Sequence, residues 1–289
     1  MLIMAISAPP IRMGCTAAAV IAAGWLSFAP VSAADSTTVS LVPHRAVYEL
    51  KLAQTRGRKP MQAVRGRIYY DFSGNACEGY ALRFRQMSVL DSGEGKAVTS
   101  DMRASSWEEG KAKSLQFNSQ SYLNDQLRDA VDGFAQRSQE NLGVRLTKPG
   151  TRSFDLPANL LFPTEHVRQI ILAAREGKSL LEASVYDGSE TGEKIYDTLA
   201  VIGKVIAPNE KVPTDAAAKQ AALASLLRWP VTVSYFERND AKTDQTPIYT
   251  VTFQLYENGI TRALLLDYND FVLSGEMTSL DIQKAKPCP

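Results

Sequence analysis

Histidine is scarce in this chain of 289 residues, and its scarcity limits the catalytic chemistry that the chain can perform. Only His44 and His166 are present. A catalytic triad needs a nucleophile and a base around one of them, and no G-x-S-x-G sequence supplies the nucleophile. No second histidine follows His166 one helical turn later, so a zinc site is not indicated.

The chain also lacks an apolar run long enough to span a bilayer. The longest, Met13–Phe28, is shorter than the roughly 20 residues that a spanning helix needs. It follows a lone basic residue, Arg12, and precedes small residues around Ala33. These are the three parts of a secretory signal peptide. We therefore expect residues 1–33 to be a cleaved signal peptide, with cleavage after Ala34 as the alternative.

Gly14-Cys15 offers a competing interpretation, because a lipoprotein is cleaved before a cysteine that then carries lipid. Here the apolar run follows the cysteine instead of preceding it. A lipid anchor at Cys15 is therefore not expected.

An excess of charge of either sign is missing as well. The chain has 32 Lys and Arg against 31 Asp and Glu, and removing Arg12 leaves 31 of each. A net charge of zero argues against nucleic acid as a partner. Residues 34–289 contain no further spanning run, so we expect one soluble, β-rich periplasmic domain that does not span a membrane.

Cysteine is limited to three residues, of which Cys15 lies in the predicted signal peptide. Export would place Cys77 and Cys288 in an oxidising compartment, where we expect them to form a disulfide. This bond would close a loop of 211 residues (288 minus 77) and stabilise the fold by about 5 kcal/mol in the chain-entropy model. A redox pair or metal site is the alternative, but there is no C-x-x-C spacing.

Short segments of alternating apolar and polar residues dominate the rest of the chain. In Tyr80–Leu90, for example, Leu82 and Phe84 share one face and Arg83 and Arg85 the other. Such period-2 patterning predicts a mainly β fold with a large antiparallel sheet, curled or closed. The other predicted strands are Ala46–Leu52, Gly66–Phe72, Ala97–Trp107, Ser114–Tyr122, Val144–Leu146, Leu181–Tyr186, Lys194–Val205, Val231–Phe236, Ile248–Tyr256, Thr261–Leu266 and Phe271–Leu280.

Two segments have a helical pattern instead. Thr164–Arg175 opens with Thr164 as a capping residue and places apolar residues on one face, and Gly177 ends it. One helix laid across the mouth or hollow of the curled sheet would be consistent with this order of elements. The Ala-rich segment Asp215–Leu227 predicts a second helix, closed by Trp229-Pro230.

The remaining candidate ligands have simpler structural interpretations. His44 stands where the first strand begins, and we expect a hydrogen-bonded structural role for it. Asp187–Glu193 lacks the alternating ligands of an EF-hand and predicts a hairpin turn. The carboxylates of Glu49, Asp71 and Asp267 are too scattered to pair.

Arginines on two predicted strands are a further candidate. Arg65, Arg67, Arg83 and Arg85 could hold an anionic ligand, although exposed sheet faces are usually charged. The sequence alone therefore predicts no catalytic residue, no metal site and no cofactor.

Several motifs together resemble those of the EipB family of periplasmic cell-envelope integrity proteins. The similarity extends over nearly the whole mature chain. It is carried by Pro43-His44-Arg45-Ala46-x-Tyr48-Glu49-Leu50, by Gly66–Asp71 followed by Cys77 and Glu78-Gly79-Tyr80, by Leu161-Phe162-Pro163-Thr164-x-His166, by Tyr186-Asp187-Gly188-Ser189, and by Cys288.

This resemblance implies a spiral-like, broken β-barrel with a few short helices, in which a disulfide joins the early strands to the C-terminus. It implies a non-enzymatic protein that supports envelope integrity and stress resistance, with a periplasmic tetratricopeptide-repeat protein as partner. Two alternatives remain. A carrier of a lipid or other apolar ligand would release it on mutation of inward residues such as Ile170 or Phe253. An envelope hydrolase would depend on His44 or His166.

Overall fold

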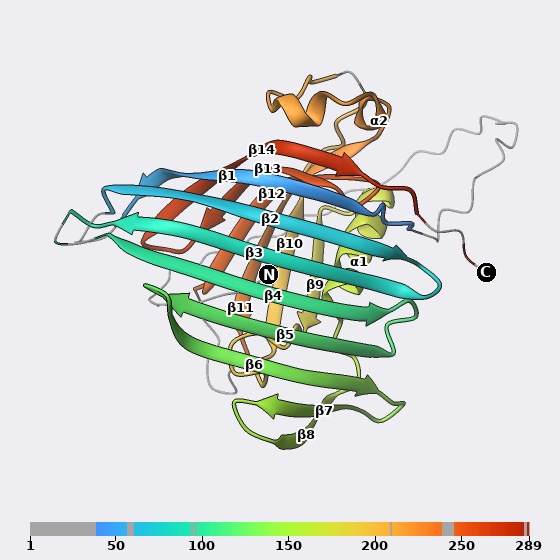
Figure 1. Ribbon diagram of the computed structural model, residues 1–289. Coiled ribbons are helices and arrows are strands. Elements are labelled where there is room, and N and C mark those ends of the chain that lie inside the picture. Colours follow the sequence, from blue (N-terminus) through green and yellow to red (C-terminus); the bar gives the residue numbers. More distant parts are fainter. Residues whose placement is uncertain are drawn as a thin grey trace, which may run out of the picture.

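The computed structural model describes residues 39–56, 61–93, 95, 97–208, 210–238, 246–285 and 288. The predicted signal peptide lies outside these residues. Within them, fourteen antiparallel strands form one sheet in the order β8-β7-β6-β5-β4-β3-β2-β1-β14-β13-β12-β11-β10-β9. The sheet curls so that β1 to β6 form a front wall and β9 to β13 a rear wall behind it (Figure 1).

The elements follow one another along the chain as hairpins, with one helix between β8 and β9. Their bounds are β1 His44–Thr55, β2 Ala63–Asn75, β3 Gly79–Asp91, β4 Val98–Glu109, β5 Ser114–Leu123, β6 Gln126–Arg137, β7 Asn141–Lys148, β8 Arg152–Pro157, α1 Pro163–Arg175, β9 Leu180–Val185, β10 Tyr196–Ile202, η1 Ala216–Lys219, α2 Ala221–Ala224, β11 Arg228–Glu237, β12 Tyr249–Tyr256, β13 Thr261–Asp267 and β14 Phe271–Ile282.

The two ends of the sheet, β8 and β9, do not pair with each other. The linker before α1 contributes a single parallel bridge at this gap, between Leu161 and Val185. The N–H of Leu161 donates to the carbonyl of Ser184 over 2.8 Å, and the N–H of Tyr186 donates to Leu161 over 2.9 Å. The predicted mainly β fold with a curled, broken sheet is thus confirmed.

Apolar side chains from both walls fill the interior between them. Tyr48 and Leu50 of β1 belong to the same buried cluster as Val231 of β11 and Tyr249 of β12. Helix α1 adds Ile170 to this cluster, so it packs across the hollow as expected. Burial on this scale is the main source of stability in such a fold.

A smaller buried cluster lies between β5, β6, β7 and the linker before α1. It includes Phe117, Val131, Leu146 and Phe162. Gly133 of β6 allows this packing, because a Cβ there would come within 2.5 Å of the Phe117 ring and 2.8 Å of Leu146. Strand β6 therefore carries small residues on its inner face.

Two helix predictions were wrong in part. Thr164 does not cap α1, because Phe162 is the N-cap residue and Pro163 occupies the first helical position. The segment Asp215–Leu227 is not one helix but two short pieces, η1 and α2, separated at Gln220. The Gln220 side chain donates to the Leu280 carbonyl over 2.7 Å, and this tertiary bond holds the backbone extended at the break.

Trp229-Pro230, expected to close that helix, belongs to β11 instead. Strands β6 and β8 were not predicted. No helix among the described residues combines the length and apolar character that crossing a membrane requires.

Candidate functional site

The N-terminus of α1 is held by an acidic residue of the front wall. Phe162 at the N-cap has no side-chain acceptor, so the first N–H groups of α1 need a partner from elsewhere. Glu108 of β4 supplies it: Oε2 accepts the N–H of Thr164 at 2.7 Å and Oε1 accepts that of Glu165 at 2.9 Å. We call Glu108 and the first turn of α1 the helix junction.

The Glu108 side chain is almost wholly buried at this junction. Burial disfavours its charged form and raises its pKa to about 7, although the two N–H donors and Arg168 favour the carboxylate. The nearest cation is the Arg168 guanidinium, with Nη2 at 3.9 Å from Oε1. Glu108 therefore changes charge near neutral pH while it holds the helix.

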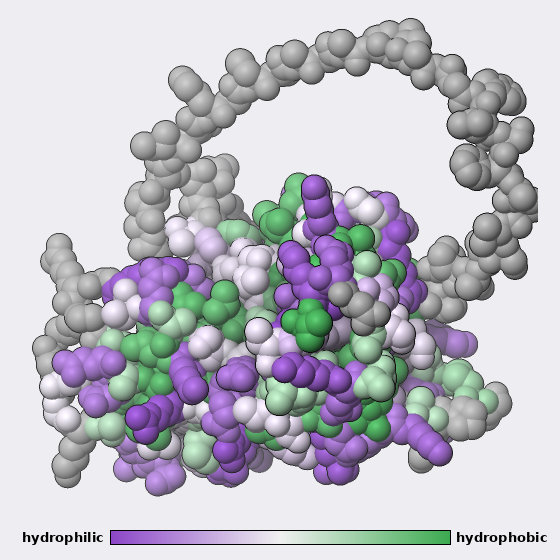
Figure 2. All heavy atoms as spheres, turned by 90° about the horizontal axis from the view of Figure 1, so that it is seen from above, coloured by the Kyte–Doolittle hydropathy of each residue, from purple (hydrophilic) through white to green (hydrophobic). Residues whose placement is uncertain are grey.

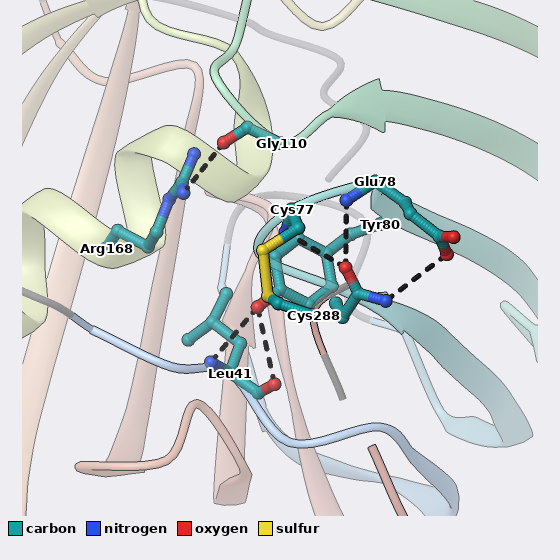
Figure 3. Close-up of a disulfide and its surroundings, with 8 residues drawn as sticks. Leu41, Cys77, Glu78, Tyr80, Gly110, Arg168 and Cys288 are labelled. Carbon is teal, nitrogen blue, oxygen red and sulfur yellow. Dashed lines mark hydrogen bonds between the residues drawn. A yellow bond between two sulfur atoms is a disulfide. The ribbon is translucent and has the colours of Figure 1, made fainter. Parts of the chain in front are cut away.

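Arg168 ties the helix junction to the disulfide region, which Figure 3 shows. Its Nη1 donates to the carbonyl of Gly110 over 3.2 Å. Gly110 in turn lies against the β2–β3 turn, where a Cβ would be only 2.3 Å from the Ala76 carbonyl oxygen. Only glycine allows this close approach of the two turns.

The disulfide joins Cys77 in this turn to Cys288, with the two Cα atoms 5.6 Å apart (Figure 3). The Asn75 side-chain oxygen accepts the N–H of Cys77 at 2.9 Å and that of Glu78 at 2.8 Å. The β2–β3 turn is thereby ordered around Cys77. The pairing expected from the sequence is the one that the structure contains.

His166 lies inside the fold on α1. Its Nε2 is 3.2 Å from Oγ1 of Thr198, which itself donates to the carbonyl of Ala183 over 2.9 Å. The Thr198 hydroxyl donates its proton to Ala183 and therefore accepts in its hydrogen bond with His166. We accordingly assign the imidazole proton to Nε2 of His166. Burial lowers the pKa of the imidazole to about 4. His166 is thus a neutral, internal histidine and not an exposed base.

His44 is likewise buried, at the start of β1. Its Nδ1 is 2.8 Å from the Val42 carbonyl oxygen, and its ring stacks on Tyr70 with centroids 5.4 Å apart. Burial lowers the pKa of His44 below its usual value. The expected structural role fits these contacts, and among the residues that the structure describes no serine or cysteine is hydrogen-bonded to either histidine.

A row of aromatic rings lines the rear wall. Tyr196, Tyr235, Tyr249 and Tyr268 follow one another with centroids 6.5, 6.2 and 5.0 Å apart. Gln86 of the front wall donates to the Tyr268 hydroxyl over 3.0 Å. These side chains occupy the interior and connect its two walls.

A buried ion pair lies where η1 meets the sheet. The Arg262 guanidinium donates to Asp215, and both side chains are nearly inaccessible, at 6% and 3% exposure. Arg262 also holds the side-chain oxygen of Gln254 at 2.6 Å. The Arg262 guanidinium lowers the pKa of Asp215, opposing the effect of its burial.

The outer side of the front wall carries the four arginines that the sequence singled out, together with Arg45 and Arg103. The alternation of each strand places them opposite the buried residues. We call the group the arginine face, and it consists of Arg45 (β1), Arg65 and Arg67 (β2), Arg83 and Arg85 (β3) and Arg103 (β4).

Three carboxylates accompany the arginine face. Glu49 pairs with Arg67, and Asp71 pairs with Arg45 at 3.3 Å. Asp101 forms ion pairs with both Arg85 and Arg103. Asp267, the third carboxylate that the sequence left unpaired, forms an ion pair elsewhere, with Arg56 at 2.9 Å.

Two hollows lie on the outer side of the sheet, near its two edges. One, of about 460 Å³, is lined by Phe134, Arg145 and Asp155 of β6 to β8. The other, of about 580 Å³, is lined by Glu182, Asp197 and Phe236 of β9 to β11 and by the α1 linker. Among the described residues no cluster of three or more His, Cys, Asp or Glu could hold a metal.

Comparison with known proteins identifies the family. A profile of the EipB-like family matches residues 35–284. The chain belongs to the EipB-like family. The resemblance noted in the sequence is therefore confirmed.

Two matches from Brucella abortus illustrate the relationship. Its cell envelope integrity protein EipB is 34% identical over 258 residues, which cover 89% of this chain and 90% of that protein. The crystal structure of a β-barrel-like protein matches with a TM-score of 0.78 and 33% identity, over 86% of this chain and 100% of that one. The chain is thus homologous to a cell envelope protein.

The sequence did not reveal three of these features: Glu108, the Asp101–Arg103 pair and the buried Asp215–Arg262 pair. A signal for Glu108 existed, because alternation continued from Ala97–Trp107 puts it on the inner face, next to Tyr80 across the strands. An inward carboxylate needs a donor, and an uncapped helix supplies donors. Which helix would supply them depends on the tertiary fold.

Proposed function

We propose that this chain is a non-enzymatic periplasmic protein that supports cell-envelope integrity and resistance to envelope stress. It acts by binding an envelope component or a protein partner. The observation that carries the proposal is the homology, over nine-tenths of both chains, to a protein named for envelope integrity. The buried, structurally engaged histidines are consistent with a role other than catalysis.

The proposal places the chain in the periplasm, delivered there by the predicted signal peptide of residues 1–33. The disulfide supports this location, because such bonds persist in oxidising compartments. A periplasmic tetratricopeptide-repeat protein is the proposed protein partner, as the family resemblance implies.

A deletion of the gene in the organism that encodes it tests the proposal. The deletion strain should lose viability on detergent or on an inhibitor of cell-wall synthesis, and the full chain should restore it. The matched control is the same chain without residues 2–33, which should not restore growth. Unchanged survival of the deletion strain, or equal rescue by the control, would contradict the proposal.

A lipid carrier is the second candidate, and the helix packed across an apolar interior favours it. Ile170 and Phe253, the inward residues predicted from the sequence, both pack in the main cluster. Side chains from both walls and α1 pack together in that space, so a bound apolar ligand would have to compete with these contacts. Organic extraction of the native protein distinguishes the two candidates.

A further inference from the structure

The front wall presents more positive than negative charge to solvent. Alternate residues of each strand face outward, and those in the middle of the wall lie within 45–51, 65–71, 83–89 and 99–105. These outward-facing residues include seven Lys or Arg and three Asp or Glu. The strand ends add Asp91 and Glu109, and the neighbouring β14 carries Glu276 and Asp281. The excess of positive charge therefore belongs to the middle of this wall, although the predicted mature chain is neutral overall.

Asp101 organises the centre of the arginine face. Arg85 donates to both of its oxygens, each over 2.8 Å, and Arg103 donates to Oδ2 over 2.6 and 3.0 Å. The Asp101 side chain is only 8% exposed, while Arg85 and Arg103 are 44% and 48% exposed. One carboxylate thus fixes two guanidinium groups that still face solvent, with a net charge of +1.

An aromatic ring also contacts one of these two guanidinium groups, that of Arg103. The Arg103 guanidinium lies over the Tyr122 ring, 4.7 Å from its centroid. Tyr69 stands directly opposite Arg85 on the adjacent strand. A preorganised guanidinium group loses little entropy when it binds, and its planar donors match phosphate oxygens.

Other arginines of this face are available for an external anion. Arg65 and Arg83 are exposed and have no ion-pair or hydrogen-bond partner among the described residues. Arg67 is 66% exposed despite its pairing with Glu49. The uncompensated charge therefore lies on β2 and β3, beside the Arg85–Asp101–Arg103 group.

Apolar side chains are interleaved with these charges. Tyr69 and Met87 are each 39% exposed, and Val89 is 43% exposed. The side of the molecule seen from above, which is not the front wall, also has hydrophilic and hydrophobic residues side by side (Figure 2). Basic residues mixed with exposed aromatic and aliphatic ones, spread over a broad wall, match a lipid surface with phosphate headgroups.

We propose that the arginine face binds the phosphate headgroups of an anionic lipid surface. The proposal names one envelope component for the function above and rests on it. The two hollows described above lie near the edges of the sheet and not on β1 to β4. The charges are distributed over a wall four strands wide, which suits an extended surface better than a single small anion.

Sedimentation with phosphatidylcholine vesicles, with and without phosphatidylglycerol, tests this inference on the oxidised mature protein. The protein should bind only the anionic vesicles and should be released at high salt. Removing three charges in R65Q/R67Q/R83Q should weaken binding roughly 100-fold, because each basic residue near such a surface contributes about a tenfold factor or less.

The matched control is K204Q/K211Q/K219Q, which removes three exposed charges from another part of the chain and should bind as the wild type does. Equal urea midpoints would show that both variants are folded. Failure of the wild type to bind anionic vesicles, equal binding by the arginine variant, or equal loss in the lysine control would overturn the inference. Binding of inorganic phosphate as tight as that of vesicles would also overturn it.

The rescue experiment separates this inference from the proposed function. An arginine variant that no longer binds vesicles but fully restores survival would overturn the anionic lipid surface as the envelope component on which the function depends, and would leave the envelope function intact. An arginine variant that fails both assays while the lysine control passes both would support the two together.

Discussion

The carboxylate of Glu108 accepts the N–H of Thr164 at 2.7 Å, and through this contact strand β4 caps the helix that crosses the interior. The same helix, one turn later, reaches the disulfide region through Arg168 and Gly110. The interior helix, the front wall and the disulfide turn are therefore connected at one place.

The substitution E108Q should lower the free energy of unfolding by about 1–3 kcal/mol. A glutamine has a single acceptor oxygen, so one of the two buried N–H groups at the start of α1 would lose its partner. Urea unfolding measures the effect. The control E109Q changes the neighbouring residue, which lies on the outer face, and should alter the urea midpoint little. An equal loss of stability in E108Q and E109Q would contradict the capping role of Glu108.

Glu108 and His166 should give opposite pH dependences. The pKa of Glu108 is raised to about 7, so its stabilising contribution is complete below about 4.5 and is lost as pH rises through 7. The pKa of His166 is lowered to about 4, so its contribution is complete above about 6.5 and is lost as pH falls toward 4.

Between pH 4.5 and 6.5 the two effects therefore oppose each other in the wild type. Relative to wild type, stability should rise more steeply with pH in E108Q and less steeply in H166Q. The change in slope should approach about 1.4 kcal/mol per pH unit in each case. Urea unfolding at several pH values measures it, and parallel curves for all three proteins would rule out these assignments.

Reduction of the Cys77–Cys288 disulfide should lower stability by up to about 5 kcal/mol, because the bond closes a loop spanning 211 positions. Urea unfolding with and without reductant measures the loss, and the C77S/C288S double variant should resemble the reduced protein. Non-reducing peptide mapping of periplasmic protein supplies a second test. Free thiols at both positions would contradict the pairing.

Loss of Asp215 should be among the most damaging single changes. The substitution D215A leaves Arg262 as an unpaired charge with 6% exposure and should cost about 3–5 kcal/mol. The control E49A breaks an exposed pair with Arg67 and should cost about 1 kcal/mol or less. The double variant D215A/R262M should regain much of the stability lost in D215A, because no unpaired buried charge remains. Urea unfolding measures this. A double variant no more stable than D215A would show that the unpaired Arg262 charge does not cause the loss.

Much of the sheet could be predicted from the sequence, because alternation is a local property. Strand β3 shows this well: Tyr80, Leu82 and Phe84 face the core and Arg83 and Arg85 face solvent, as expected. Strand β6 escaped prediction since its inner positions are Val131, Gly133 and Ala135, kept small by Phe117 and Leu146 packed against them. Small inner residues weaken the pattern on which strand prediction depends.

The functional features were harder to predict for a related reason. The break in the Ala-rich segment at Gln220 depends on the Leu280 carbonyl, 60 residues away. Glu108 meets α1 only after the sheet has curled, and Asp101 becomes the centre of an arginine group only through pairing of β3 with β4. Each of these contacts is tertiary, so no local pattern contains it.

The central claim is that the chain is a binding protein of the periplasm, closed by a disulfide and with its interior occupied by its own side chains. Native mass spectrometry tests this claim most directly. Protein purified from the periplasm is washed at high salt, and the same sample is extracted with organic solvent. We expect the mass of residues 34–289 (or 35–289) with one disulfide and no bound molecule. A stoichiometric apolar molecule retained through the wash would contradict the filled interior and make the chain a carrier.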